Sequence, residues 1–151
     1  MAMTYREPAT PSAGQLLYTK FASFPMVCFT LTLLTDIAYW QSANLMWQNF
    51  SAWLLLSGLV VAAFAALAGL VILISSSRLR ALPMIWFYAI GNVIVLLVAI
   101  ANSLVHARDG WTAIVPLGLT LSAITVVLML ITGWMGTRIV HQYRIEEVHH
   151  V

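Results

Sequence analysis

Four long apolar runs constrain this chain more than any other feature. They cover about residues 22–42, 53–75, 84–105 and 113–135, and the run from Trp53 to Ser75 contains no charged residue. A helix needs roughly 20 apolar residues to cross the hydrocarbon core of a bilayer, so each run is long enough to cross it once. With 62% hydrophobic and 8% charged residues, the chain is too apolar for a water-soluble domain. We therefore expect an all-α integral membrane protein.

Short connections between the runs set the expected topology. Helices joined by roughly 7 to 11 residues must alternate in direction, which predicts an antiparallel four-helix transmembrane bundle. We expect a polar N-terminal tail over residues 1–20, the transmembrane domain over 21–138 and a C-terminal tail over 139–151. The connection over residues 41–52 carries no charge, and we expect it to lie along the headgroups or against a partner.

The basic residues predict the orientation. The seven Lys and Arg residues lie at the borders of the runs rather than along one face, so we expect no nucleic-acid partner. Basic residues in short loops mark the cytoplasmic side. Arg108 falls alone on one side, and six fall on the other: Arg6, Lys20, Arg78, Arg80, Arg138 and Arg144. We therefore expect both termini in the cytoplasm.

The tryptophans agree with this orientation. Tryptophan is enriched at the two membrane–water interfaces, where its ring sits at the level of the headgroups. Four tryptophans fall at the expected outer boundary, Trp40, Trp47, Trp53 and Trp111, and two toward the inner one, Trp86 and Trp134.

Asp36 is the only Asp, Glu, Lys or Arg residue well inside a run. An intramembrane acid costs about 2.5 to 3.5 kcal/mol and marks a candidate functional site. Counting depth along the helices at 1.5 Å per residue, we expect a polar pocket in the outer half made of Asp36, Ser57, Asn102, His106 and Ser122. The simpler interpretation is structural: Asp36 is protonated or hydrogen-bonded to Asn102 or a threonine, and ties the first helix to the third.

Small residues mark the faces expected to pack together. Lipid gives helices no hydrophobic drive to associate, so close approach of their backbones has to hold the bundle. On the second helix we expect this role for Gly58, Ala62, Ala66 and Gly69, and on the fourth for Gly118, Gly133 and Gly136.

The positions of the histidines do not favour cofactor binding. Four-helix membrane bundles can hold a haem between two histidines, but His106 and His141 follow opposite ends of the spans, about 30 Å apart. We expect no cofactor or metal. Two alternatives stay open: a haem with His106 as its one histidine ligand and a Met or Tyr opposite, or a quinone. Five tail residues are expected to be solvated rather than to bind a metal: His141, Glu146, Glu147, His149 and His150. The chain also lacks phosphate-loop, metalloprotease and nucleophile-elbow motifs.

Several short motifs support a resemblance. They are Phe24-Pro25, Asp36, the run from Ala65 to Gly69, the run from Gly133 to Gly136, and Ile139-Val140. With these, the chain resembles a bacterial family of predicted four-helix inner-membrane proteins classed as a domain of unknown function. The resemblance covers most of residues 20–145 and implies a multi-pass protein of the bacterial inner (plasma) membrane, but no activity. Many relatives carry histidines near the start of the first helix, where this chain has Phe21, Ala22 and Ser23. This departure weakens any inherited haem role.

Two functions fit these observations. We expect a non-catalytic accessory or assembly subunit that contacts the lipid bilayer and other membrane subunits or copies of itself. The alternative is a bundle that binds haem, quinone or a small solute in the pocket around Asp36 and His106. A transmembrane proton or ion pathway ranks last, because it would need more than one intramembrane carboxylate.

Overall fold

The computed structural model describes the backbone of residues 13–108 and 114–149, and the side chains of residue 21 and of residues 23–108 and 114–141. Within these ranges the chain is helical, without a strand. The four long helices are α1 (Ala13–Ser42), α2 (Leu45–Ser75), α4 (Pro83–His106) and α5 (Leu119–His149). Two short elements are α3 (Ser77–Ala81) and η1 (Ile114–Gly118), which contains a kink at Val115.

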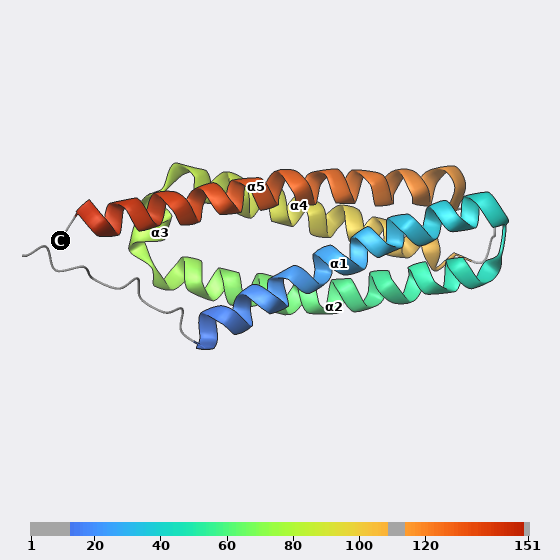
Figure 1. Cartoon of the computed structure of the whole chain (residues 1–151), viewed down its shortest axis with the longest axis horizontal. Coiled ribbons are helices and arrows are strands. Elements are labelled where there is room, and N and C mark those ends of the chain that lie inside the picture. The colour runs from blue at the N-terminus through green and yellow to red at the C-terminus, as the bar shows by residue number, and fades with distance from the viewer. Residues whose placement is uncertain (1–12, 109–113, 150–151) are drawn as a thin grey trace, which may run out of the picture.

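The predicted all-helical membrane fold is confirmed in its main feature. Four helical stretches are long and apolar enough to cross a membrane: Ser23–Ser42, Leu45–Ser75, Pro83–His106 and Ile114–His141. Consecutive long helices run in opposite directions (Figure 1). The turn between α1 and α2 lies at the same end of the molecule as the end of α4 and the start of α5 (Figure 1). We call this the turn end, and the opposite end, which carries α3 and the last turns of α5, the terminal end.

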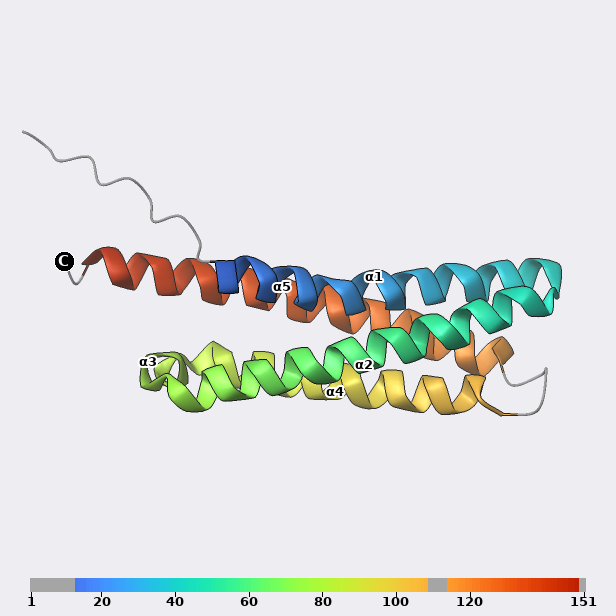
Figure 2. The ribbon, with the colours of Figure 1, turned by 90° about the horizontal axis from the view of Figure 1, so that it is seen from below.

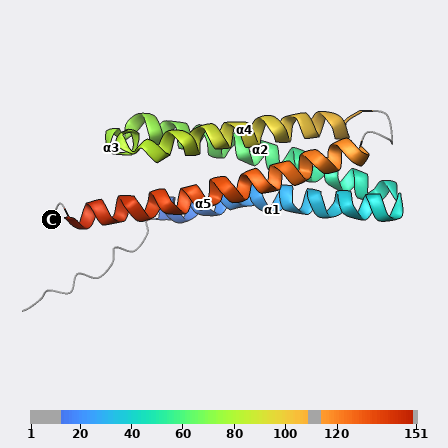
Figure 3. The same cartoon turned by 90° about the horizontal axis from the view of Figure 1, so that it is seen from above.

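The helices form two layers. One contains α1 and α5 and the other contains α2 and α4 (Figure 2). The layers are also joined by α1 against α2 and α4 against α5, so each long helix has two neighbours. Seen from above and below, the layers lie close together at the turn end and separate toward the terminal end (Figures 2 and 3). Burial follows the same gradient, since the buried residues of α2 all lie between Ser51 and Ala62, and those of α4 between Val95 and His106.

The connection between α1 and α2 differs from the expectation. It was predicted to occupy residues 41–52, but only Ala43 and Asn44 separate the helices. Ala43 has a positive φ of 51°, and the Asn44 side chain caps α2 by accepting a hydrogen bond from the backbone of Met46 at 3.0 Å. Residues 45–52 contain no Gly or Pro to interrupt a helix. The polar residues there lower the hydropathy without ending the helix.

Parts of both predicted tails are also helical. Helix α1 begins at Ala13 and α5 continues to His149, so residues 13–20 and 139–149 extend their spans rather than form separate tails. Helical hydrogen bonding does not stop where hydropathy falls, which is why hydropathy alone places these ends too far inward. Residues 1–12, with Arg6, and the loop residue Trp111 lie outside the described residues.

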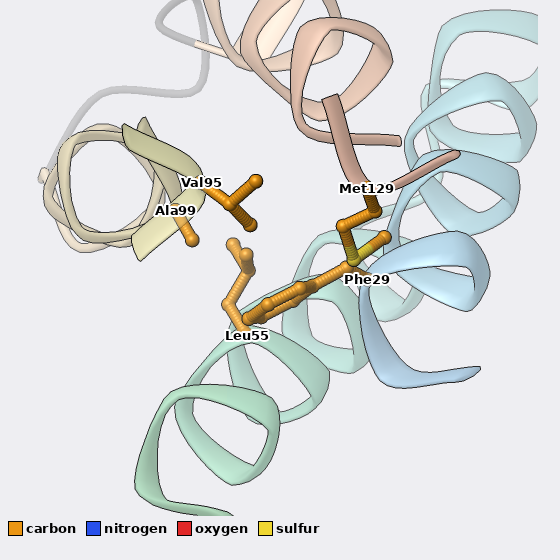
Figure 4. Close-up of a cluster of buried hydrophobic side chains, with 5 residues drawn as sticks. All are labelled: Phe29, Leu55, Val95, Ala99 and Met129. Carbon is orange, nitrogen blue, oxygen red and sulfur yellow. The ribbon is translucent and has the colours of Figure 1, made fainter. Parts of the chain in front are cut away.

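A small apolar core occupies the middle of the bundle. Its buried members come from all four long helices: Phe29, Leu55, Val95, Ala99 and Met129 (Figure 4). Many other large apolar side chains point outward, among them Trp53, Phe64 and Phe87, each 68% exposed. Outward apolar side chains are the arrangement expected of helices whose solvent is lipid.

The small residues divide into those that pack inside the bundle and those that do not. A Cβ on Gly58 would lie 2.7 Å from Phe29 Cε1, and one on Gly136 would lie 3.1 Å from Tyr88 Cε2. Ala62 and Gly118 are also buried. At these four positions the small residue lies on a face that meets a neighbouring helix. Gly69 is half-buried and lies beyond the last buried residue of α2.

Two of the predicted packing positions were wrong. Ala66 is exposed, because α2 buries no residue beyond Ala62. Gly133 is exposed and has open space around it. The close contact at that level is made instead by Gly91, where a Cβ would lie 2.6 Å from Thr132 Cγ2. Here α4 supplies the small residue and α5 the larger one.

Candidate functional site

A buried polar cluster lies near the turn end. Asp36 comes from α1, Ser51 from α2, Asn102 and His106 from α4, and Ser122 from α5. Asp36, Ser51 and Asn102 are 0% exposed, and Ser122 and His106 are 1% and 5% exposed. We refer to these five residues as the turn-end cluster. It joins all four long helices at one level.

The Asp36 carboxylate is the centre of the turn-end cluster. Oδ1 accepts a hydrogen bond from Ser51 Oγ at 2.6 Å, and Oδ2 accepts one from Ser122 Oγ at 2.5 Å. Oδ1 also lies 2.9 Å from His106 Nε2. Each of the other three long helices therefore contributes one partner to this carboxyl group. Such partners offset much of the cost of burying an acid.

The hydrogen bonds of His106 define how many protons Asp36 and His106 hold between them. Nδ1 lies 3.0 Å from the Asn102 carbonyl oxygen, which can only accept, so Nδ1 carries a hydrogen. One further proton lies between Nε2 and Asp36 Oδ1, 2.9 Å apart. Either an imidazolium faces a carboxylate, or a neutral imidazole accepts from a carboxylic acid. The pair has zero net charge in both descriptions, which suits a site without solvent exposure.

Asn102 contacts Ser122, one of the residues that bind the Asp36 carboxylate. Its Nδ2 donates to Ser122 Oγ at 2.8 Å, which fixes the hydroxyl that Ser122 directs at Asp36. Its Oδ1 is buried and has no hydrogen-bond partner among the described residues. A buried acceptor without a partner is uncommon and marks a place where a water or a donor group fits.

Thr35 lies at the edge of the turn-end cluster and contacts it through Ser51. Its Oγ1 lies 2.7 Å from Ser51 Oγ, and the carbonyl oxygens of Thr32 and Leu31 lie 2.9 and 3.0 Å away as alternative acceptors. Unlike the five members of the cluster, Thr35 is only half-buried. The hydroxyl pair of Thr35 and Ser51 thus extends from a partly accessible position to the buried carboxylate.

Gly118 forms one wall of the site. A Cβ at this position would lie 3.0 Å from His106 Cε1 and 3.5 Å from Nδ1. Glycine lets the start of the fourth span approach the imidazole closely near Cε1, between its two nitrogens.

The structure brings together Asp36, Asn102, His106 and Ser122, four of the five residues expected in the pocket. The prediction that Ser57 belongs to the pocket was wrong, because Ser57 is exposed. Ser51 is the residue of α2 that lies in the pocket. The second apolar run starts at Trp53, whereas the helix itself begins at Leu45, so the apolar run alone does not give the depth of a residue on α2. Asp36 precedes Ala43 by seven residues and Ser51 follows Asn44 by seven, so a tight turn pairs them. Recognising Asn44 as a helix cap would have revealed this register.

Both ring nitrogens of His106 have partners within the protein. Iron ligation by His106 would require a free ring nitrogen, and both nitrogens are engaged. Among the described residues no three His, Cys, Asp or Glu side chains are grouped to hold a metal ion. His141 is exposed, and the remaining residues of the expected tail group, Glu146, Glu147, His149 and His150, lie outside the described side chains.

Comparison with known protein families gives a match. A family model described as "Predicted membrane protein (DUF2231)" matches residues 20–149, which include all four candidate spans. No curated protein and no solved structure matches the chain. The family description names no activity, so the functional argument depends on the geometry of the site.

Proposed function

The chain belongs to the DUF2231 family of predicted membrane proteins, and we propose that it acts as a non-catalytic accessory or assembly subunit. In this proposal it packs against other membrane subunits or against copies of itself. The observation that carries the proposal is the engagement of Asp36 by hydrogen-bond partners from all three other long helices. The residue best suited to chemistry is used to hold the bundle together.

The remaining polar groups support this interpretation. A general base or nucleophile needs a face open to its substrate, but the Asp36 and His106 side chains are 0% exposed. Both ring nitrogens and both carboxylate oxygens have partners within the protein. The turn-end cluster is therefore suited to fixing the positions of four helices.

Outward-facing small residues on two separate helices support the proposed contact with a partner. Ala66 on α2 and Gly133 on α5 are exposed, and a Cβ at Gly133 would meet nothing within 4 Å. Small residues allow a helix of another subunit to approach the backbone closely, which is how helices associate in lipid.

The distribution of charge supports an orientation with both termini in the cytoplasm, as in a protein of the inner membrane. Exposed arginines near the terminal end are Arg78, Arg80 and Arg138, whereas Arg108 follows α4 at the turn end. This bias favours the terminal end as the cytoplasmic side. Trp40 and Trp53, 60% and 68% exposed, belong to the turn-end half, which fits an aromatic belt at the opposite interface.

Native mass spectrometry after gentle extraction tests the proposed assembly. We expect a mass above that of the 16.7 kDa chain, from copies or from co-extracted subunits. Gly133→Leu should reduce this assembly by blocking close approach. Val127→Phe, which adds bulk at an exposed apolar position on a different face of α5, serves as the control. A lone monomer without a co-extracted protein would contradict the proposal.

The unpartnered Asn102 Oδ1 favours a second candidate, the binding of a small solute that donates a hydrogen bond beside the turn-end cluster. A quinone carbonyl would not suit this position, because it is itself an acceptor. Mass spectrometry of small molecules released from the purified protein, with an absorption spectrum for haem, tests this candidate. A colourless protein that releases no solute would exclude it.

A further inference from the structure

We propose that Thr35 and Ser51 form a proton-exchange path that connects the buried Asp36–His106 pair to the membrane surface at the turn end. This function is separate from the proposed assembly role and does not depend on it. It ends at the turn-end cluster and does not cross the membrane. Three contacts carry the inference, because together they form a continuous chain of exchangeable hydrogens.

The contacts have a consistent direction. Ser51 Oγ has one hydrogen, which it directs at Asp36 Oδ1 over 2.6 Å, so it is free to accept from Thr35 Oγ1 at 2.7 Å. The chain continues from Oδ1 to His106 Nε2 at 2.9 Å. All three distances are within the range of hydrogen bonds. Thr35, the outermost member, is also the only one that is half-buried.

The position of Ser51 along α2 places the path near water. The helix has 31 residues and is about 46 Å long at 1.5 Å per residue. The hydrocarbon core is about 30 Å thick, so a centred helix extends about 8 Å beyond it at each end. Ser51 lies about 9 Å from Leu45 along the axis, at the boundary between hydrocarbon and headgroups. The exposed ring of Trp53, at nearly the same level, is typical of that boundary.

Proton transfer along the path balances at every atom. Inward transfer moves a proton from a surface water to Thr35 Oγ1, the Thr35 hydroxyl proton to Ser51 Oγ, and the Ser51 hydroxyl proton to Asp36 Oδ1. At each hydroxyl one O–H bond forms as another breaks. The Asp36–His106 pair gains one proton and the water becomes hydroxide. The reverse sequence returns a proton from the pair, and no electron transfer or further reactant is needed.

Ser122 provides a matched comparison within the same site. It also donates to the Asp36 carboxylate and is also fully buried. Its other partner is the buried Asn102 Nδ2, an amide that donates but does not relay protons as a hydroxyl does. Two serines thus make equivalent bonds to Asp36, but only Ser51 is joined to a half-buried hydroxyl.

Solvent exchange of the His106 ring hydrogens tests the path. The full chain, with ¹⁵N-labelled histidine, is placed in lipid nanodiscs and transferred to D₂O, and the loss of the ring N–H signals is followed by NMR. Ser51→Ala and Thr35→Val should each slow exchange about tenfold or more, which corresponds to a barrier raised by about 1.4 kcal/mol. Ser122→Ala removes a hydroxyl that donates to the same carboxylate but leaves the path from Thr35 intact, so it should slow exchange less than Ser51→Ala does. Thr30→Val, outside the site, should leave the rate within about twofold of the wild-type rate, less than about 0.5 kcal/mol in the barrier.

Several outcomes would overturn the proposal. Equal slowing by Ser51→Ala and Ser122→Ala would show that any loss of a donor to Asp36 has the same effect. An unchanged rate in Thr35→Val would show that the path does not begin at Thr35. Thr35→Val keeps the test decisive if Ser51→Ala fails to fold, because valine has the shape of threonine and Thr35 lies at the edge of the site. Thr30→Val, on the same helix and bonded to Met26 O, controls for loss of a threonine hydroxyl.

Discussion

At the residue scale, the environment of Asp36 explains how an acid is accommodated inside a membrane bundle. Its carboxyl group has three partners from three helices, and the proton it shares with His106 keeps the pair neutral. The sequence identified Asp36 as exceptional because its residue type is rare in a span. It could not identify Ser51 as a partner, because serine is common in membrane helices and only the register of the turn distinguishes Ser51 from Ser57.

Asp36→Asn should retain the fold, whereas Asp36→Leu should not. The asparagine amide can donate to His106 Nε2 while its carbonyl accepts from Ser122, so it mimics the protonated acid. Leucine leaves His106 and both serines without their partner and should cost about 3 to 5 kcal/mol. Reversible unfolding in mixed micelles, followed by circular dichroism, measures the difference. Equal destabilisation by the two variants would mean that the ionised carboxylate itself is required.

At the element scale, hydropathy located the helices but not their ends or all of their contact faces. The four runs correspond to α1, α2, α4 and the span within α5. Helix α2 begins at Leu45 because Asn44 caps it, a local hydrogen bond to which hydropathy is insensitive. Ala66 and Gly133 are of the same residue types as Ala62 and Gly58, so the sequence does not distinguish them. The way the helices cross decides which of these residues meets a neighbouring helix.

Gly58→Ala should destabilise the pairing of α1 with α2. The new methyl group would lie 2.7 Å from Phe29 Cε1 and 3.0 Å from Cys28 Cβ, so the helices must move apart or the ring must shift. Overpacking of this kind costs about 1 to 3 kcal/mol. Gly133→Ala, which meets no atom within 4 Å, is the matched control and should be neutral or stabilising by up to about 1 kcal/mol. The same unfolding assay compares them, and equal stability of the two variants would contradict close packing at Gly58.

At the scale of the whole molecule, the structure has distinct ends. The turn end carries the turn-end cluster and the short turn at Ala43 and Asn44. The terminal end carries α3 and the exposed Arg78 and Arg80. The sequence predicted this asymmetry from the positions of the basic residues, but the depth of the cluster depended on where the helices begin.

Labelling of introduced cysteines tests the proposed orientation. Ser42→Cys places an exposed thiol at the turn end, and Ser77→Cys places one at the terminal end. An impermeant thiol reagent should modify Ser42→Cys in cells with a permeable outer envelope and an intact inner membrane. It should modify Ser77→Cys only after that membrane is opened. The native Cys28 is buried, so unmodified wild-type protein is the background control, and the opposite pattern would reverse the assigned orientation.

The uneven burial of α2 and α4 has a mechanical consequence. Helix α2 buries no residue beyond Ala62, and α4 buries none before Val95, so stiffness should decrease along the long axis of the molecule. Backbone amides near Ile74 should exchange with solvent deuterium sooner than those near Leu55, because local opening requires fewer packed contacts to be lost. A binding partner or a change in bilayer thickness could then adjust the spacing of the softer half, while the distances among the helices at the stiffer half remain fixed.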